Sequence, residues 1–507
     1  YGKVDISGML HYRQTSGFDG IVESDRQTIL DNTLSSFGYP AVSQAPGSVP
    51  DGRQEYDMNL KVAYEEFYFE GLYINKNVSP FIGGPQYALT DESQIGDNYV
   101  FGEVGYKKKY EKFTIKPRLY YDQFDLDNYI ESLPEGTTVP FDTDKDGNYD
   151  TLKTYPDGFI GNGKVTQKII GTEIPFDYEL FDGNVITLGL EYRLINQTNI
   201  EFSSNFHPAT YAVLDSVQDF SDTYPFLREV TRRIWSIYLQ DTWNITDTVN
   251  LTLGAWHDRY SDLGGATSPR SSLTWEFMKD ASMKLLYGEA FRAPNFVEMF
   301  TTNQPAIQGN EDLDPETIRT YEFGLSYRFN KYVTSGVNYF YNDIKDLIVR
   351  RTLESNQNTS RYENFGDAYV RGVEMETKVD ITKGNYVFMN YTFQNPEDDD
   401  GNDLPSVAKH KGNLGVNVHY WKYMKTNLST FVSGKRTRDA GDTRDDLPAY
   451  ALLNLSVIGK EFFKTMEIQG TVYNLLDKDY SDSGPIPIPE DLLRPGRTFF
   501  VGLSYQF

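Results

Sequence analysis

The sequence has no cysteine, little tryptophan and histidine, and no long apolar run. The absence of Cys from all 507 residues excludes disulfides, thiolate metal sites and Cys nucleophiles. Hydrophobic residues make up only 39%, the mean hydropathy is -0.53, and no stretch approaches the roughly 18 apolar residues of a spanning helix. A helical membrane protein is therefore excluded. A β-barrel is not excluded, because only every second residue of a membrane strand must be apolar.

Charge and aromatic content narrow the class further. The net charge of -25 argues against a nucleic-acid partner, because phosphates would be repelled. It suits a surface that attracts cations, or that divalent ions bridge to anionic lipid head groups, or simply long soluble loops. The 38 Tyr and 32 Phe could form aromatic girdles at membrane interfaces, although a Tyr-rich soluble β protein would show the same composition.

Alternation of apolar and polar residues predicts strands along the whole chain. In 321–329, aromatic and apolar side chains alternate with small or charged ones, and the stretch 496–507 repeats the pattern and ends on Phe507. About twenty such strands can be drawn. They cover 2–13, 56–65, 67–75, 100–109, 113–124, 164–178, 185–196, 229–243, 248–260, 268–277, 281–291, 316–329, 332–350, 362–381, 384–395, 409–421, 424–437, 449–460, 464–475 and 496–507.

The connections between these strands alternate strictly between tight turns and long loops. Phe181-Asp182-Gly183-Asn184 is typical of the turns, and the long acidic loop 125–163 is typical of the loops. In an outer-membrane barrel every second connection is long, so the short turns lie at one end and the long loops at the other. A soluble sandwich has no reason to sort its loops in this way.

Several blocks of sequence resemble the TonB-dependent outer-membrane receptor family. The blocks are Phe291-Arg292-Ala293-Pro294, the run 309–316 (GNEDLDPE), the strand 321–329, 342–348 (NDIKDLI) and 474–480 (NLLDKDY). The resemblance is strong from about residue 285 onward. Before that, only the pattern of alternating strands agrees with the family. A terminal Phe after an alternating strand also resembles the assembly signal of Gram-negative outer-membrane barrels.

The resemblance implies an all-β fold, a transmembrane antiparallel β-barrel in the outer membrane of a Gram-negative bacterium. The family's barrel has 22 strands closed by a plug domain. Counting back from the last strand, this chain would begin near the third, with residues 1–507 forming one barrel domain. We expect the plug and the first two strands as further chain or as a separate polypeptide, because open strand edges are costly in lipid.

The family imports scarce nutrients and carries out no covalent chemistry, so we expect no enzyme. The favoured cargo is a ferric siderophore or a related metal chelate. Cobalamin, a plugless porin, or a structural or adhesive barrel stay as alternatives. Expected partners are the plug domain, a TonB-type inner-membrane energiser, outer-membrane lipid and lipopolysaccharide, around a monomeric barrel. Haem and copper are disfavoured, because 295–309 lacks the His expected of haem receptors and the Met residues are dispersed.

Ligand capture in such a barrel would use aromatic and polar groups at the loops and lumen. Girdle or loop packing is the alternative role for each of them, and Arg292 is expected to face the lumen and hydrogen-bond the plug or the barrel wall. The candidates are Tyr149, Tyr155, Tyr211, Tyr224, Phe226, Arg228, Arg292, Phe296 and Phe300.

The acidic loop also contains the start of a calcium-binding pattern. Oxygen-bearing side chains at alternate positions, with Gly147 for the bend, could converge on one Ca²⁺. The twelfth position is Lys153 instead of Glu, so the pattern is incomplete and a solvated acidic loop is the alternative. The candidate ligands are Asp142, Asp144, Asp146, Asn148 and Asp150. The Arg- and Asp-rich stretch 436–446 is interpreted as a mixed-charge loop without a further role.

Overall fold

The computed structural model describes residues 4–80, 87–90, 92–141, 151–303, 307–353, 356–462, 465–486 and 488–505. Its principal sheet has 23 strands, of which β7, β8 and β14 are short additions to longer neighbours. The other twenty are β1 (Val4–Thr15), β4 (Arg53–Tyr64), β5 (Phe67–Val78), β6 (Gln94–Tyr106), β9 (Arg118–Leu133), β12 (Phe159–Phe181), β13 (Asn184–Phe206), β15 (Val230–Thr246), β16 (Val249–Tyr260), β17 (Gly264–Met278), β18 (Ala281–Arg292), β20 (Glu316–Arg328), β21 (Val333–Lys345), β24 (Ala368–Thr382), β25 (Asn385–Asp398), β26 (His410–Trp421), β27 (Met424–Ser433), β28 (Tyr450–Phe462), β29 (Met466–Tyr473) and β32 (Thr498–Tyr505).

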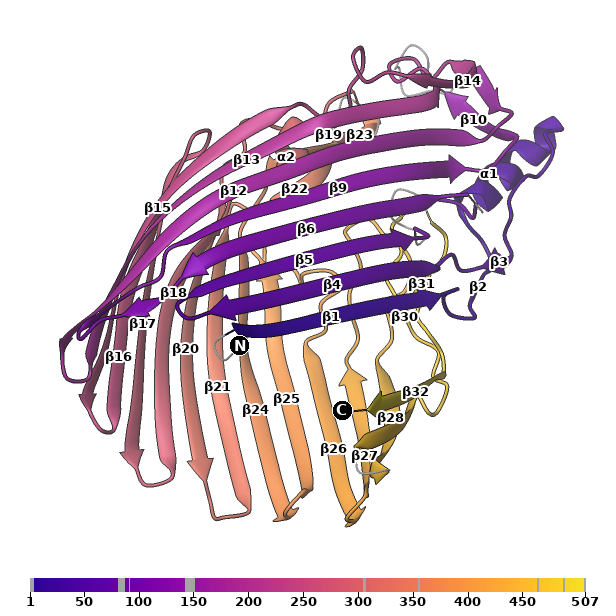
Figure 1. Cartoon of the computed structure of the whole chain (residues 1–507). Helices are drawn as coiled ribbons and strands as arrows, with labels where there is room; N and C mark the ends of the chain where they lie inside the picture. Colours follow the sequence, from indigo (N-terminus) through magenta and orange to yellow (C-terminus); the bar gives the residue numbers. More distant parts are fainter. Residues whose placement is uncertain are drawn as a thin grey trace.

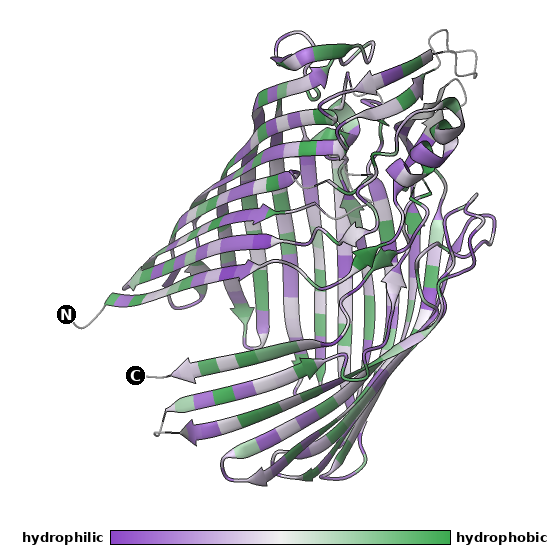
Figure 2. Ribbon diagram, turned by 90° about the vertical axis from the view of Figure 1, so that its right-hand side faces the viewer, coloured by the Kyte–Doolittle hydropathy of each residue, from purple (hydrophilic) through white to green (hydrophobic). Residues whose placement is uncertain are grey.

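Each long strand pairs antiparallel with the next one along the chain. The register runs from Val4↔Tyr64 between β1 and β4 to Met466↔Tyr505 between β29 and β32. The sheet curls around a common interior (Figure 1). Within the described residues no register joins β1 to β32, and Figure 2 shows these two edges apart. We call the gap between them the seam.

The connections confirm the predicted sorting with one exception. Tight turns such as Asp182–Gly183 lie at one end of the sheet, the turn side, and long connections gather at the other, the loop side (Figure 1). The exception is on the loop side, where only residues 261–263 join β16 to β17. The sequence predicted a longer loop there because β17 begins with Gly264 and Gly265, which do not show a strand pattern.

The long loops contain more regular structure than the sequence predicted. The expected loop 125–163 is largely taken up by the ends of β9 and β12 and a hairpin, and the connection after β13 carries a further strand. The smaller elements are β2 (Ile21–Val22), α1 (Arg26–Leu34), η1 (Ser35–Phe37), β3 (Gly47–Ser48), β7 (Lys108–Lys109), β8 (Phe113–Ile115), β10 (Thr137–Phe141), β11 (Thr151–Tyr155), β14 (Val213–Asp219), α2 (Phe296–Phe300), β19 (Ile307–Gln308), β22 (Ile348–Leu353), β23 (Asn356–Asn364), β30 (Ser481–Asp482) and β31 (Leu492–Leu493). No helix of the described segments is long and apolar enough to cross a bilayer.

The two faces of the sheet have inverted polarity compared with a soluble sheet. On the outer face Leu190 is 51% exposed and Leu239 is 54% exposed, whereas on the inner face Glu173 is 9% and Asp258 is 6% exposed. Figure 2 shows the same alternation along the strands. A sheet that exposes apolar side chains and shelters charged ones is suited to contact with lipid.

A belt of hydrogen-bonded acidic, basic and aromatic side chains lines part of the inner face. Arg118 on β9 donates to Glu103 on β6 at 2.8 Å and to Glu173 on β12 at 2.6 Å. The Tyr238 hydroxyl on β15 donates to Glu173 at 2.8 Å, and the Tyr68 hydroxyl on β5 donates to Glu103 at 2.7 Å. The charges of the belt are therefore paired across several strands, which compensates for their burial.

Glycines on the inner face let aromatic rings of this belt lie flat on the sheet. A Cβ added to Gly189 would stand 2.0 Å from the Tyr238 ring, and one added to Gly171 would stand 2.1 Å from the Tyr120 ring. Real carbon atoms do not approach so closely, so these positions accept only glycine unless the ring moves. By contrast, Gly288 on the inner face of β18 has open space where its Cβ would be.

We expect Gly189→Ala to destabilise the folded sheet by about 1–3 kcal/mol, because the Tyr238 ring must leave its position above β13. The matched control is Gly288→Ala, which should be neutral or slightly stabilising, because a less flexible unfolded chain favours folding. Urea unfolding in lipid vesicles, followed by the heat-dependent mobility of the folded protein in gels, measures both. Equal effects of the two variants would contradict the packing role of the glycine.

Candidate functional site: the loop side of the sheet

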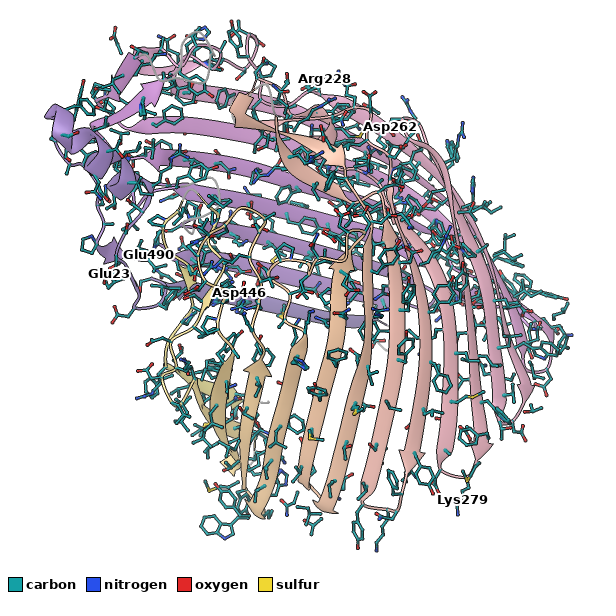
Figure 3. All side chains as sticks on the ribbon, turned by 180° about the vertical axis from the view of Figure 1, so that it is seen from behind. Glu23, Arg228, Asp262, Lys279, Asp446 and Glu490 are labelled. Atoms are coloured by element: carbon teal, nitrogen blue, oxygen red, sulfur yellow. The ribbon has the colours of Figure 1, made fainter. Side chains whose placement is uncertain are left out.

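Loops that belong to opposite ends of the chain pack together across the seam. Val22, Val49, Leu89 and Ile488 are buried against one another, and we call them the seam cluster. They come from the connections after β1, β5 and β29. The backbone N–H of Glu23 also donates to a carboxylate oxygen of Glu490 at 3.1 Å, where both are labelled in Figure 3. On the loop side the seam is thus bridged by side chains, although the strands below it do not pair.

Helix α1 is held in this assembly by a buried carboxylate. Asp25 is fully buried at the helix N-cap and accepts from the Thr28 N–H at 2.8 Å and the Leu89 N–H at 2.8 Å. The Thr137 hydroxyl from the start of β10 donates to Gln27 at 2.9 Å. An N-cap of this kind stabilises a helix by about 1 kcal/mol. Here Asp25 also joins two loops, and Gln27 adds a third.

An aromatic cluster fixes the hairpin β10–β11 against the connection between β13 and β15. Its buried members are Tyr155, Phe202, Phe206 and Phe220, with Phe141, Phe159, Tyr211, Tyr224 and Phe226 packed around them. Three of the predicted ligand residues that surround it, Tyr211, Tyr224 and Phe226, are half-buried and keep some accessible surface. The ring of His207 lies edge-on to Tyr224 at a centroid distance of 4.9 Å, which gives this loop histidine a packing role.

Tyr155 lies at the centre of this cluster. Its side chain has no exposed surface, and its hydroxyl donates to the Tyr211 carbonyl at 2.8 Å. Burial raises the pKa of both Tyr155 and Tyr211, because the phenolate would be poorly solvated. Tyr155 thus takes the loop-packing role that the sequence left as the alternative.

A second cluster is built around α2 and an arginine that the sequence analysis did not single out. Arg232 on β15 is 5% exposed and donates to both carboxylate oxygens of Asp262, at 2.9 and 3.1 Å, and to the Pro294 carbonyl at 3.0 Å. Its guanidinium also lies 4.8 Å from the ring centroid of Phe296. The two-residue period of β15 could have shown Arg232 to face inward, on the same side as Tyr238.

The predicted residues Phe296 and Phe300 are both buried in this second cluster, with Met299 and Leu313. Arg292, at the end of β18, donates to Glu298 of α2 at 2.9 Å and to Glu316 of β20 at 2.5 Å. It therefore joins the loop 293–315 to the wall. This agrees with the expected wall contact.

Arg228 is the most accessible of the predicted residues that the structure describes. Its guanidinium lies 4.6 Å from the Phe300 ring centroid and donates to Glu311 at 2.7 Å, while the side chain stays 54% exposed. Figure 3 shows it on the loop side, near Asp262. A cation held over an aromatic ring and open to solvent can bind an anionic or aromatic ligand.

The stretch 436–446 does more than the predicted mixed-charge loop. Arg438 is almost completely buried and donates to Asp491 at 2.6 and 2.8 Å, which ties this loop to the connection before β32. Arg444 donates to Asp442 at 2.6 Å and lowers the pKa of that carboxyl to about 2. The sequence could not show this, because Asp491 is far from Arg438 along the chain.

The predicted calcium loop lies outside the described residues, as does the ligand candidate Tyr149. Its two flanks are described, and Phe141↔Thr151 is the last register pair of the β10–β11 hairpin on each side of it. Lys153, at the twelfth position of the pattern, donates to the Thr210 carbonyl at 2.7 Å. The two strands on either side of the segment are thus held on the aromatic cluster. Calcium binding by Asp142, Asp144, Asp146, Asn148 and Asp150 stays a prediction.

A small cavity near the seam does not have the size of a nutrient site. It measures about 210 Å³ and is lined by residues that include Tyr450, Lys478, Tyr480 and Asp491. Sites for drug-sized ligands occupy roughly 300–1,000 Å³. No group of three or more His, Asp or Glu residues in the described segments is arranged to hold a metal. On the loop side, Arg228 keeps the most exposed side chain of the predicted ligand residues that the structure describes.

Comparison with known proteins supports this architecture. A family model described as TonB dependent receptor-like, beta-barrel matches residues 24–475. The probable TonB-dependent siderophore receptor PirA of Acinetobacter baumannii is 25% identical over 391 residues, which cover 66% of this chain and 50% of that protein. The ferrienterobactin receptor of Escherichia coli is 22% identical over 416 residues, covering 69% of this chain and 55% of that protein.

Another relative is the iron-regulated outer membrane virulence protein of Vibrio cholerae, 26% identical over 297 residues that cover 54% of this chain and 44% of that protein. The vitamin B12 transporter BtuB of Vibrio cholerae is 25% identical, with 49% of this chain and 39% of that protein covered. The chain thus spans about half the length of the curated relatives it matches.

Solved structures agree in fold. The copper transporter OprC superposes with a TM-score of 0.75 at 14% identity, over 99% of this chain and 76% of that chain. The siderophore receptor PirA from Acinetobacter baumannii gives a TM-score of 0.69 at 19% identity, over 100% of this chain and 76% of that chain. Because the family model matches nearly the whole chain, the protein belongs to the TonB-dependent receptor β-barrel family.

Proposed function

We propose that the chain is the barrel of an outer-membrane receptor that imports a ferric siderophore or a related metal chelate. The observation that carries the proposal is the family match together with relatives named as siderophore receptors. The apolar outer face fits insertion in a membrane, and the relative from Vibrio cholerae is named as an outer membrane protein. Receptors of this kind select cargo by binding, so the barrel itself needs no covalent chemistry.

In this proposal the loop side faces the outside of the cell and captures the chelate. Arg228, which is paired with Glu311, presents an exposed guanidinium beside the ring of Phe300, while the buried aromatic cluster and Arg232 hold the loops in place. Anionic chelates are bound best by charge-assisted hydrogen bonds from groups that are already positioned. The cargo would then pass along the polar inner face once an energised partner of the TonB type displaces a plug.

Cobalamin is the second candidate cargo, favoured by the match to BtuB. Cobalamin depends less on a positively charged contact than an anionic iron chelate does. Removal of the Arg228 side chain should therefore weaken binding of an anionic iron chelate more than binding of cobalamin. Direct uptake measurements distinguish the two cargoes as well.

We further propose that additional strands and a plug complete the barrel. The outer edges of β1 and β32 carry backbone N–H and C=O groups that no other strand of the described residues pairs with. Such edges are costly in lipid. Since β1 runs from the turn side to the loop side and β32 runs the other way, an even number of inserted strands would keep every neighbour antiparallel. Two strands agree with the 22 of the large plugged barrels, and the match covers only 50% of the related receptor PirA, which leaves room for them.

Deletion of the gene should abolish uptake of one iron chelate under iron starvation. Transport of radioactive iron bound to catecholate, hydroxamate and citrate carriers, measured beside labelled cobalamin, identifies the cargo. Restoration by the intact gene is the control. Unchanged uptake of every iron chelate with loss of cobalamin uptake would transfer the proposal to cobalamin, and unchanged uptake of all would contradict a receptor role.

Arg228→Ala should weaken binding of the transported chelate about tenfold or more, because a charge-assisted hydrogen bond contributes about 1.5–3 kcal/mol. The control is Arg319→Ala, which removes an equally exposed arginine from the outer face of β20, where it pairs with Glu289. Ligand titration followed by intrinsic fluorescence measures both. A loss of the same size in the two variants would assign the effect to net charge instead of contact.

Protein extracted from outer membranes should have a mass larger than the 507 residues account for, or should copurify with a plug polypeptide. Intact mass spectrometry with mapping of peptides tests this. A mass that matches these residues alone, with no copurifying chain, would contradict the completed barrel and favour a passive pore or a structural barrel. Steady ion conductance in planar bilayers would then identify the pore.

A further inference from the structure

Positive charge is concentrated in one turn of a strongly acidic chain. Residues 107–116 contain five lysines and a single acidic residue, Glu111, in a protein with a net charge of -25. Together with Tyr106 we call this segment the lysine hairpin. It lies on the turn side, as does Lys279, whereas the acidic residues labelled in Figure 3 lie on the loop side.

The lysine hairpin is longer than tight turns such as Asp182–Gly183 and contains its own pair of short strands. It continues beyond β6 and β9 as β7 and β8, with Lys108↔Ile115 and Lys109↔Thr114 in register. Backbone hydrogen bonds fix it on both sides, from the Lys107 N–H to the Glu66 carbonyl at 2.8 Å and from the Glu179 N–H to the Lys112 carbonyl at 2.7 Å. Its charges are therefore held in a defined position.

Two of its lysines are neutralised and three are not. Lys108 forms an ion pair with Glu66, and Lys116 forms one with Asp177. Lys107, Lys109 and Lys112 are exposed, and their ammonium groups have no acidic partner among the residues that the structure describes. Three uncompensated positive charges close together on an acidic protein are a binding surface for an anion.

Aromatic rings lie on the outer face of the same hairpin, together with Lys108, whereas the register places Lys109 on the inner face. Phe113 stacks on Tyr110 at a centroid distance of 4.5 Å and on Phe176 of β12 at 5.3 Å. Phe67 of β5 contacts Tyr106 at 4.9 Å and is 56% exposed on the outer face. Exposed aromatic side chains of this kind mark the level where acyl chains meet head groups in membrane proteins.

We propose that the lysine hairpin binds an anionic phospholipid of the leaflet on the turn side. The ammonium groups of Lys107, Lys109 and Lys112 would attract the phosphate to the end of the hairpin, and the rings of Tyr110 and Phe113 on its outer face would contact the start of the acyl chains. A soluble anion would not contact the neighbouring apolar rings, whereas the acyl chains of an amphiphile would, and this favours an amphiphile. The inference rests on the proposed insertion in a membrane but not on the identity of the cargo.

Other turns also place a lysine beside an aromatic ring, but with fewer lysines. Lys331 lies over the ring of Tyr332 at 4.8 Å, and Lys422 lies over Tyr423 at 4.7 Å, each as a single lysine at its turn. Because attraction to anionic lipid increases by about 1 kcal/mol for each basic residue near the surface, a cluster of three should bind far better than isolated ones. Single lysines at separate turns, such as Lys331, supply matched controls.

The test compares two triple variants of the full-length protein purified from membranes. One is Lys107→Ser, Lys109→Ser and Lys112→Ser, and the control is Lys279→Ser, Lys331→Ser and Lys383→Ser, which removes the same charge from three separate turns. Native mass spectrometry during titration with phosphatidylglycerol measures lipid binding. Phosphatidylethanolamine, inorganic phosphate and lipid A are titrated in parallel, and heat-dependent gel mobility verifies that every variant is folded in the membrane.

We expect the hairpin variant to bind phosphatidylglycerol about tenfold or more weakly, and the control variant to change less than about threefold. A hairpin variant with arginine at the three positions should retain binding. Equal losses in the two triple variants, equal binding of phosphatidylethanolamine, or preference for free phosphate or lipid A would each overturn the proposal. Uptake of the cargo by both variants should be unchanged, so failure here is distinct from failure of the proposed receptor function.

Discussion

Backbone hydrogen bonding between neighbouring strands is the constraint on which this structure depends. A chain whose apolar side chains face lipid cannot leave N–H and C=O groups unpaired, because no water is present to satisfy them. Every long strand from β4 to β29 has a partner on both sides, and this uninterrupted register permits the inverted polarity of the sheet. The two outer edges at β1 and β32 are the places where the constraint is not yet met.

Because the polarity of the sheet is inverted, the side chains that need specific hydrogen-bond partners lie on its inner face. A soluble protein places apolar side chains in its core, where packing is not directional, but this sheet must satisfy charged groups such as Arg118, Glu103 and Glu173 on its inner face. Each belongs to a different strand, so their hydrogen bonds fix the strands relative to one another. Aromatic rings above glycines, as at Gly189, then lie close against this polar wall.

The sequence predicted the strands well because a period of two is a local signal. The twenty predicted strands correspond to the long strands of the structure, although many boundaries lie several residues away. The predicted alternation of short turns and long loops has its exception at 261–263. The loops were predicted poorly. Helix α1, the burial of Tyr155 and the role of Arg232 depend on contacts between segments that are distant in the sequence, and no local pattern of residues shows which segments meet.

The seam cluster has a consequence for the order in which the molecule can assemble. Its contacts join Glu23 to Glu490, two positions separated by 467 residues, whereas strand pairing elsewhere joins near neighbours in the chain. Contacts of high sequence separation form slowly, because a long segment must be ordered before they are gained. Hairpins can therefore form early, whereas the loop that carries Val22 and Val49 must wait for the loop that carries Ile488. Until these two loops meet, the apolar side chains lack part of their cover and are open to aggregation.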